Sequence, residues 1–69
     1  MEQNKILFKE RLKELRKEKG LSQKEFAEKL GIAVSTYANW EQGRTEPSIC
    51  DIYNLLSTFE VEANELFSK

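Results

Sequence analysis

The sequence contains no histidine and only one cysteine, Cys50. A single cysteine excludes an intrachain disulfide. Without histidine, the usual zinc-ligand sets and the Ser–His or Cys–His pairs that activate nucleophiles are also missing. No phosphate-binding glycine loop replaces them, so we expect no metal site, no cofactor and no enzymatic activity. Cys50 lacks the partners of a redox site and is expected to be an inert small side chain.

Long apolar runs are absent as well. The longest uninterrupted runs are two to three residues, such as Ile6-Leu7-Phe8. Runs this short form neither a membrane-spanning helix nor the apolar region of a signal peptide. We therefore expect a cytoplasmic protein that has no membrane segment, and no small-molecule effector site is evident.

What is present fits a small folded domain. The 69 residues are 39% hydrophobic and 33% charged, which is ordinary for a globular chain and sufficient for one domain over 1–69. A single core of this size leaves little surplus stability, so a homodimer is expected. The fourth-to-fifth helix region is a candidate dimer surface, although the same residues could be core: Phe59, Val61, Leu66 and Phe67.

The charges are unevenly distributed along the chain. The net charge is −1, but residues 1–44 carry ten of the 11 Lys and Arg and seven of the 12 acids, a net of +3. Residues 45–69 carry one lysine and five acids, a net of −4. Either these are ordinary solvated helix faces, or contacts to phosphate come from the first two thirds of the chain.

Hydrophobic periodicity predicts five helices and no sheet. They cover about 5–19, 22–30, 33–42, 48–59 and 62–67. Serines with an acid three residues on predict capping boxes at Ser22 and Ser48, and Pro47 excludes a helix through the preceding loop. The apolar faces predict the core: Phe8, Leu12, Leu15, Phe26, Ala27, Leu30, Tyr37, Trp40, Ile49, Ile52, Leu55, Leu56, Phe59 and Leu66.

The aromatic residues have two interpretations. Trp40, Tyr37 and Phe59 could form a platform on which nucleic-acid bases stack. Their helical spacing instead matches the buried face, so we expect core positions. The Tyr37 hydroxyl then needs a hydrogen-bond partner, for which a phosphate at the rim is one candidate.

The segment Leu21–Thr45 predicts two short helices joined by a glycine turn. The outward face of the second helix is small and uncharged: Val34, Ser35, Ala38 and Asn39. Protein surfaces normally carry long charged side chains, whereas small apolar, hydroxyl and carboxamide groups suit the base edges in a DNA groove.

This segment and its flanks resemble the phage-repressor/Cro-type helix-turn-helix family, also called the Xre family. The matching parts are Leu12-x-x-Leu15-Arg16, Gly20-Leu21-Ser22-Gln23, Phe26-Ala27, Leu30-Gly31, Trp40-Glu41-x-Gly43-Arg44, Pro47-Ser48 and the closing Val61…Glu65-Leu66-Phe67. The resemblance implies an all-α, compact five-helix, lambda-repressor-like domain with a central helix-turn-helix at about 22–42. It also implies a sequence-specific DNA-binding regulator of transcription, expected to be a repressor, that inserts helix 33–42 into the major groove of double-stranded DNA as a dimer.

The resemblance assigns roles to individual residues. Val34, Ser35 and Asn39 match base-reading positions, and a carboxamide such as that of Asn39 can pair with adenine through two hydrogen bonds. The phosphate-binding candidates are Gln23, Thr36, Arg44 and Thr45. Arg16 and Glu41 match a partly buried structural ion pair between the first helix and the recognition helix. For each DNA contact the alternative is an ordinary exposed side chain.

The sequence departs from the family pattern at a few positions. Ala33 stands where Ser or Thr caps the recognition helix, Glu60 where Gly or Asn ends the fourth helix, and Glu62 where Ser or Thr caps the fifth. Glu46 adds an acid beside the phosphate-binding loop. These departures suggest modest DNA affinity per monomer and do not overturn the resemblance.

A second functional hypothesis is also kept: a protein-interaction module, such as an antitoxin or regulator, that binds a protein partner through the acidic C-terminal third.

Overall fold

The computed structural model describes residues 8–67, which form five helices and contain no strand. The helices are α1 (Phe8–Glu18), α2 (Gln23–Leu30), α3 (Val34–Gln42), α4 (Ile49–Phe59) and α5 (Ala63–Phe67). The predicted all-α, five-helix architecture is confirmed. Residues 5–7, predicted as the start of the first helix, lie outside the described residues, as does the side chain of Phe67.

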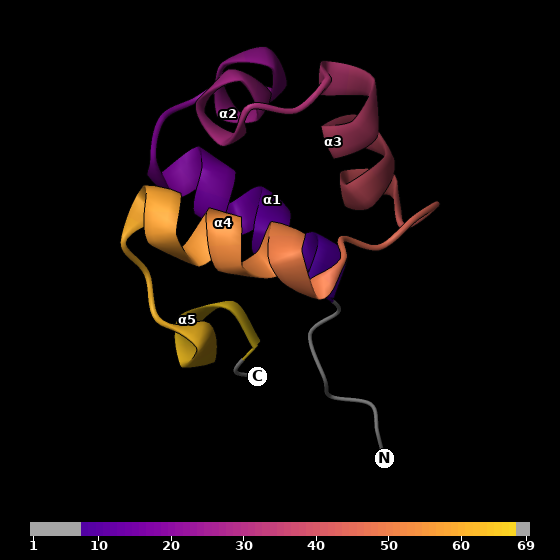
Figure 1. Ribbon diagram of the computed structural model, residues 1–69. Coiled ribbons are helices and arrows are strands. Elements are labelled where there is room, and N and C mark those ends of the chain that lie inside the picture. The colour runs from indigo at the N-terminus through magenta and orange to yellow at the C-terminus, as the bar shows by residue number, and fades with distance from the viewer. Residues whose placement is uncertain (1–7, 68–69) are drawn as a thin grey trace.

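Each helix packs against particular neighbours. α3 packs against both α1 and α2, α4 packs against α2, and α5 packs against α1. α2 and α3 lie together at one end of the domain and α5 lies at the other, with α1 and α4 between them (Figure 1). The predicted helix-turn-helix is thus held on one end of a helical support.

Serine capping boxes start two of the helices. The Ser22 hydroxyl accepts a hydrogen bond from the Glu25 amide at 3.0 Å, and the Glu25 carboxylate accepts one from the Ser22 amide at 2.9 Å. Ser48 and Asp51 form the same arrangement before α4. These bonds satisfy amide groups that have no partner inside the helix. α3 begins without such a bond because Ala33 has no side-chain acceptor.

A left-handed residue ends each of α2, α3 and α4. At the end of α2, Gly31 has φ 75°, and the Ile32 amide donates to the Ala27 carbonyl at 3.1 Å. Glycine adopts this conformation without steric cost. Glu60 performs the same role after α4 with φ 55° and is the only non-glycine residue with positive φ within 8–67. Glu60 stands where the family has Gly or Asn, and a side chain at this positive φ strains the local backbone.

Aromatic rings link three helices in the core. The Phe26 ring stacks on the Phe59 ring with centroids 4.2 Å apart and meets the Tyr37 ring at 4.8 Å. Tyr37 in turn lies edge-on to Trp40 at 6.0 Å. All four residues are buried. The core interpretation of Trp40, Tyr37 and Phe59 is confirmed, and a base-stacking platform built from these three rings is excluded.

The structure contradicts one expectation about apolar residues and decides between two alternatives for others. Ile49, expected in the core, is 72% exposed, while Leu55 and Phe59 are buried. At about 100° per residue, Ile49 lies roughly a quarter turn around α4 from the direction those two residues share. Phe59 and Leu66, which the sequence left open as dimer surface or core, are only 8% and 2% exposed, so the core alternative is confirmed. They are core residues and leave little surface there for a partner.

Candidate nucleic-acid interface

The outer face of α3 is open to solvent and uncharged. Val34, Ser35 and Thr36 are exposed, and Ala38 and Asn39 are half-buried. The opposite face holds the buried Tyr37, Trp40 and Glu41, so the single charged side chain of α3 points inward. The exposed groups that remain are methyl, hydroxyl and carboxamide groups, and these can approach base edges without first losing a salt bridge.

The packing of α2 against α3 and α4 holds α3 in place and leaves its outer face open to solvent. Ala27 is buried where α2 meets its neighbours, and a methyl group there permits close approach of the helices. At the end of α2, the Asn54 carboxamide of α4 donates to the Leu30 carbonyl at 2.8 Å. Nothing in the local sequence pattern of Asn54 indicates this bond, because its acceptor lies 24 positions away.

Arg16 and Glu41 are brought together as an ion pair between α1 and α3. Arg16 Nε donates to Glu41 Oε2 at 2.6 Å, and Arg16 Nη2 donates to Glu41 Oε1 at 3.3 Å. The remaining guanidinium nitrogen, Nη1, donates to the Leu21 carbonyl at 2.9 Å. The Arg16 guanidinium therefore links three parts of the fold: α1, to which it belongs, the loop that precedes α2, and α3.

Glu41 receives two more hydrogen bonds. Gln23 Nε2 donates to Glu41 Oε1 at 2.9 Å, and the Tyr37 hydroxyl donates to Glu41 Oε2. Tyr37 is fully buried, so a phosphate as the partner of its hydroxyl is wrong. The partner of the Tyr37 hydroxyl is instead the carboxylate of Glu41, one turn further along the same helix and inside the core.

The electrostatics of Glu41 follow from these contacts. Burial acts to raise its carboxyl pKa, but hydrogen bonds from Arg16, Tyr37 and Gln23 outweigh burial and hold the pKa below the ordinary value. The hydrogen bond to Glu41 raises the pKa of Arg16. Burial, followed by the hydrogen bond to Glu41, raises the pKa of Tyr37 far above its usual range. The cluster is therefore an ion pair with a neutral phenol throughout the physiological pH range.

The other predicted contact residues surround the outer face of α3. Gln23 is the first residue of α2 and is half-buried because its carboxamide turns toward α3. Arg44 and Thr45 are exposed just beyond α3. The Arg44 amide donates to the Asn39 carbonyl at 3.0 Å, and the Gly43 amide donates to the Trp40 carbonyl at 3.1 Å. This paired C-terminal motif fixes the backbone of Arg44 relative to the face of α3.

A second arginine, overlooked in the sequence, supports the fold at the far end. Arg11 Nη1 donates to Glu14 at 2.5 Å, and Arg11 Nη2 donates to the Glu65 carbonyl. Arg11 thereby connects α1 to α5. The spacing of Arg11 and Glu14 indicates only a local helical pair, so no sequence signal pointed to the contact with α5.

Other kinds of site find no support in residues 8–67. No three His, Cys, Asp or Glu side chains of that segment are grouped so that they could hold a metal ion. None of its helices has the length and apolar character required to cross a bilayer.

The helix-turn-helix arrangement agrees with comparison to known proteins. The sequence profile of the helix-turn-helix family matches residues 12–66. The chain belongs to the helix-turn-helix family. This family, made up of DNA-binding transcription regulators of the Xre type, is non-enzymatic, so the prediction of a non-enzymatic domain is confirmed by the family match.

Named relatives place the chain within that family. It is 42% identical over 60 residues to the HTH-type transcriptional regulator AnsR of Bacillus subtilis, covering 87% of this chain and 52% of the relative. It is 40% identical over 57 residues to the HTH-type transcriptional regulator DdrOP3 of Deinococcus deserti, covering 83% of this chain and 44% of the relative. The chain thus spans about half the length of these two regulators.

A solved structure matches at nearly full length. The restriction-modification controller protein C.AhdI of Aeromonas hydrophila superposes with a TM-score of 0.80 at 38% sequence identity. The match covers 87% of this chain and 91% of the controller protein. The five-helix fold is therefore also that of a protein of similar size.

Proposed function

We propose that this chain is a sequence-specific DNA-binding regulator of transcription that inserts α3 into the major groove. The observation that carries the proposal is the exposed, uncharged outer face of α3 on a rigid α2–α3 unit. In a helix-turn-helix, the second helix lies in the major groove and the first crosses the DNA backbone. The regulators and the controller protein to which the chain is similar support the same role.

Three side chains of α3 read the bases in this proposal. Asn39 forms two hydrogen bonds with an adenine, and Val34 packs on a thymine methyl group. Ser35 donates or accepts one hydrogen bond and adds little discrimination by itself. Since α3 has no exposed charge, the preference for one sequence comes from shape and hydrogen bonding rather than from net attraction.

Phosphate contacts flank the reading face. Gln23 uses one amide hydrogen for Glu41, and a carboxamide has a second one available for a phosphate oxygen. The positive end of α2 lies beside it and favours an anion. Thr36, Arg44 and Thr45 make the remaining contacts, and Arg44 contributes the charge. These contacts set the position of α3 and carry no sequence information of their own.

We further infer that two copies bind a two-fold-related operator and that binding represses transcription. Dimers of this motif separate their recognition helices by about 34 Å, one turn of DNA. Repression needs only occupancy of a promoter, so no effector-binding surface is required for it. That residues 1–69 form a single domain, and that the protein acts in the cytoplasm, stay predictions.

Selection of bound duplexes from a random library, followed by titration at several salt concentrations, tests the proposal. We expect one enriched, two-fold-related sequence. The logarithm of the binding constant should fall linearly with the logarithm of the salt concentration, with a slope of about −0.9 per phosphate neutralised. A library that yields no enriched sequence, together with no binding at low ionic strength, would overturn it. The alternative, a module that binds a protein partner through its acidic third, would then be favoured.

A further inference from the structure

Lys9 of α1 lies against the C-terminal end of α3. A methyl group added to Gly43 would lie 3.0 Å from Lys9 Cδ and 3.3 Å from Lys9 Nζ, so the lysine chain occupies the space that this glycine leaves open. Lys9 is half-buried, as expected when a lysine packs its aliphatic stem and keeps its ammonium in water. The start of α1 thus brings a positive charge to the end of α3 (Figure 1).

The ammonium of Lys9 is not neutralised by an ion pair within the described segment. The ion pairs of residues 8–67 join Arg11 to Glu14 and Arg16 to Glu41, and neither includes Lys9. The last carbonyls of α3 carry partial negative charge, which attracts the ammonium to this end of the helix. Partial charges do not cancel a full charge, so Lys9 can still pair with an anion.

A hollow opens beside Lys9, and we call it the Lys9 hollow. It has a volume of about 220 Å³ and is lined by Phe8, Lys9, Trp40, Gly43, Thr45 and Glu46. This volume exceeds the space of one water molecule and can therefore admit phosphate oxygens. The backbone amides of Gly43 and Arg44 already donate to carbonyls of α3. The charge that attracts an anion must come from a side chain, and Lys9 is the single cation in the lining.

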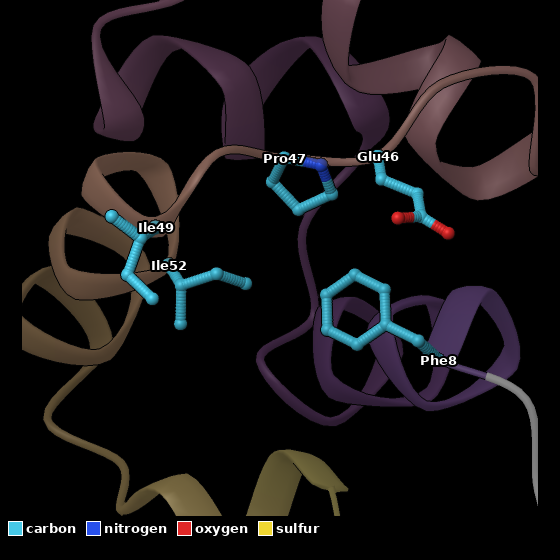
Figure 2. Close-up of a pocket in the computed structure, with 5 residues that line it drawn as sticks. All are labelled: Phe8, Glu46, Pro47, Ile49 and Ile52. Carbon is cyan, nitrogen blue, oxygen red and sulfur yellow. The ribbon is translucent and has the colours of Figure 1, made fainter.

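Glu46 borders the same hollow and acts against Lys9. Figure 2 shows its carboxylate on the side of Phe8 opposite to the two isoleucines of α4. Glu46 and Phe8 both line the Lys9 hollow, and Glu46 is exposed. Its negative charge would repel a phosphate that Lys9 attracts, so it should lower the affinity of this site for an anion.

We propose that the Lys9 hollow holds a backbone phosphate of the bound duplex. Lys9 supplies the positive charge, Thr45 donates from its hydroxyl, and Glu46 limits the affinity. The inference rests on the proposed function and deepens it, because α1 becomes a third source of backbone contacts beside α2 and the loop after α3. A duplex is the favoured source of the phosphate, since the hollow adjoins the loop that the proposed function already places on the DNA backbone.

Salt titration of single variants tests the role of Lys9. Lys9→Gln should weaken binding to selected and scrambled duplexes alike, by about fivefold. It should also make the salt slope less steep by about one per bound chain. Lys9→Arg preserves the charge and should retain the wild-type slope. The matched control is Lys29→Gln, at an exposed position that borders Thr58 and Phe59 of α4; it should leave the slope unchanged.

A purely structural role for Lys9 would give a different result. A lysine that only stabilised the end of α3 would, on replacement by glutamine, lower the urea midpoint and leave the salt slope unchanged. We expect the opposite pattern, a midpoint close to that of the wild type together with a shallower slope. An unchanged slope in Lys9→Gln, or an equal change in Lys29→Gln, would overturn the inference.

Glu46→Gln tests whether both residues act at one site. Removing this carboxylate should strengthen binding to any duplex by about threefold at low salt. In the Lys9→Gln background the same substitution should have a smaller effect, because no phosphate is then held beside Glu46. Equal gains in the two backgrounds, or no gain in either, would overturn the shared site.

Duplexes that each carry one neutral methylphosphonate linkage locate the phosphate. We expect one position per half-site at which the neutral linkage weakens binding of the wild type but not of Lys9→Gln. Inorganic phosphate at matched ionic strength should not compete with the duplex, and selective competition would identify a free anion as the occupant instead. DNA binding with no such position would remove this inference and retain the proposed function. A wild-type chain that binds no duplex at low ionic strength would remove both.

Discussion

The carboxamide of Gln23 donates a hydrogen bond of 2.9 Å to the buried carboxylate of Glu41. Gln23 is the first residue of α2, and Glu41 lies on the inner side of α3. Because Arg16 and Tyr37 hold the same carboxylate, the orientation of Gln23 is set by the core. A proposed phosphate-binding group is thus positioned before any ligand arrives, which reduces the conformational entropy lost on binding.

Replacing Glu41 should destabilise the fold strongly. In the Glu41→Ala variant the Arg16 guanidinium, whose side chain is only 15% exposed, loses its counter-charge, and the buried Tyr37 hydroxyl loses its acceptor. We expect the free energy of unfolding to fall by about 3 kcal/mol, as for other broken buried ion pairs. Urea denaturation followed by circular dichroism measures the change. The control is Glu46→Ala at an exposed acid, expected to change stability by less than about 0.5 kcal/mol. Equal small losses in both variants would contradict the role of the pair.

Acid stability should depend on the same carboxylate. The folded pKa of Glu41 lies below its ordinary value of 4.5, so the unfolded chain takes up this proton first as the pH falls. The stability that Glu41 contributes is therefore complete above about pH 5 and is lost as the pH falls through the folded pKa. Comparing wild type with Glu41→Gln between pH 6 and 2.5 tests this, because the stability gap between them should narrow in acid. A gap that widens as the pH falls would reverse the assigned sign.

Asn39 should determine sequence preference. Removing its carboxamide in Asn39→Ala eliminates a base-pair contact worth about 1–3 kcal/mol of discrimination. We expect the preference for the selected duplex over a scrambled duplex to fall at least fivefold, while affinity for the scrambled duplex stays nearly constant. Competition binding by fluorescence anisotropy measures both. Asn64→Ala, at an exposed position of α5, is the control and should alter neither value. Unchanged preference in Asn39→Ala would remove Asn39 from base reading.

Arg44 should contribute to affinity for any DNA sequence. Arg44 is exposed just beyond the end of α3, and a phosphate contact there does not distinguish bases. Arg44→Ala should weaken binding to selected and scrambled duplexes about equally and make the salt slope less steep by about one. Arg44→Lys preserves the charge and should retain the wild-type slope. A loss confined to the selected duplex would instead identify Arg44 as a base-reading residue.

Glu60 offers a stabilising substitution. Its left-handed backbone at φ 55° is strained for a side chain but free of strain for glycine. Glu60→Gly should raise the free energy of unfolding by about 0.5–1 kcal/mol, the strain relieved less the extra chain entropy of glycine. The urea midpoint measures it. Ser57→Gly, inside α4 at an ordinary helical φ, should lower stability by about 0.5 kcal/mol. A decrease in both variants would show that Glu60 is not strained.

Local sequence rules predicted most of the helix boundaries. Ser22 and Ser48 start helices because a hydroxyl and an acid three residues later bond neighbouring amides, an interaction contained within four residues. Gly31 ends α2 because only glycine adopts a left-handed conformation freely. The buried aromatics also follow from a short-range signal, since the spacing of Tyr37 and Trp40 places both on the inner face of one helix.

Contacts between helices were harder to predict. The partner of the Tyr37 hydroxyl depends on where the Glu41 carboxylate turns, which Arg16 decides from 25 residues away. The spacing of Ile49 predicts that it belongs to the apolar stripe of α4. Whether a neighbouring helix buries this end of the stripe depends on the angle at which α4 crosses α2. Asn54 and Arg11 bond backbone carbonyls on other helices, and no periodicity reports such bonds.

By itself the sequence determined the five helices, their caps and the inward or outward side of α3, because these depend on neighbours a turn or two away along the chain. Only the tertiary structure decided that Gln23 is held by Glu41, that Phe59 and Leu66 are enclosed, and that Ile49 and Tyr53 remain exposed. These outcomes depend on how packed helices meet in space, where residues far apart in sequence become neighbours and exclude or admit solvent.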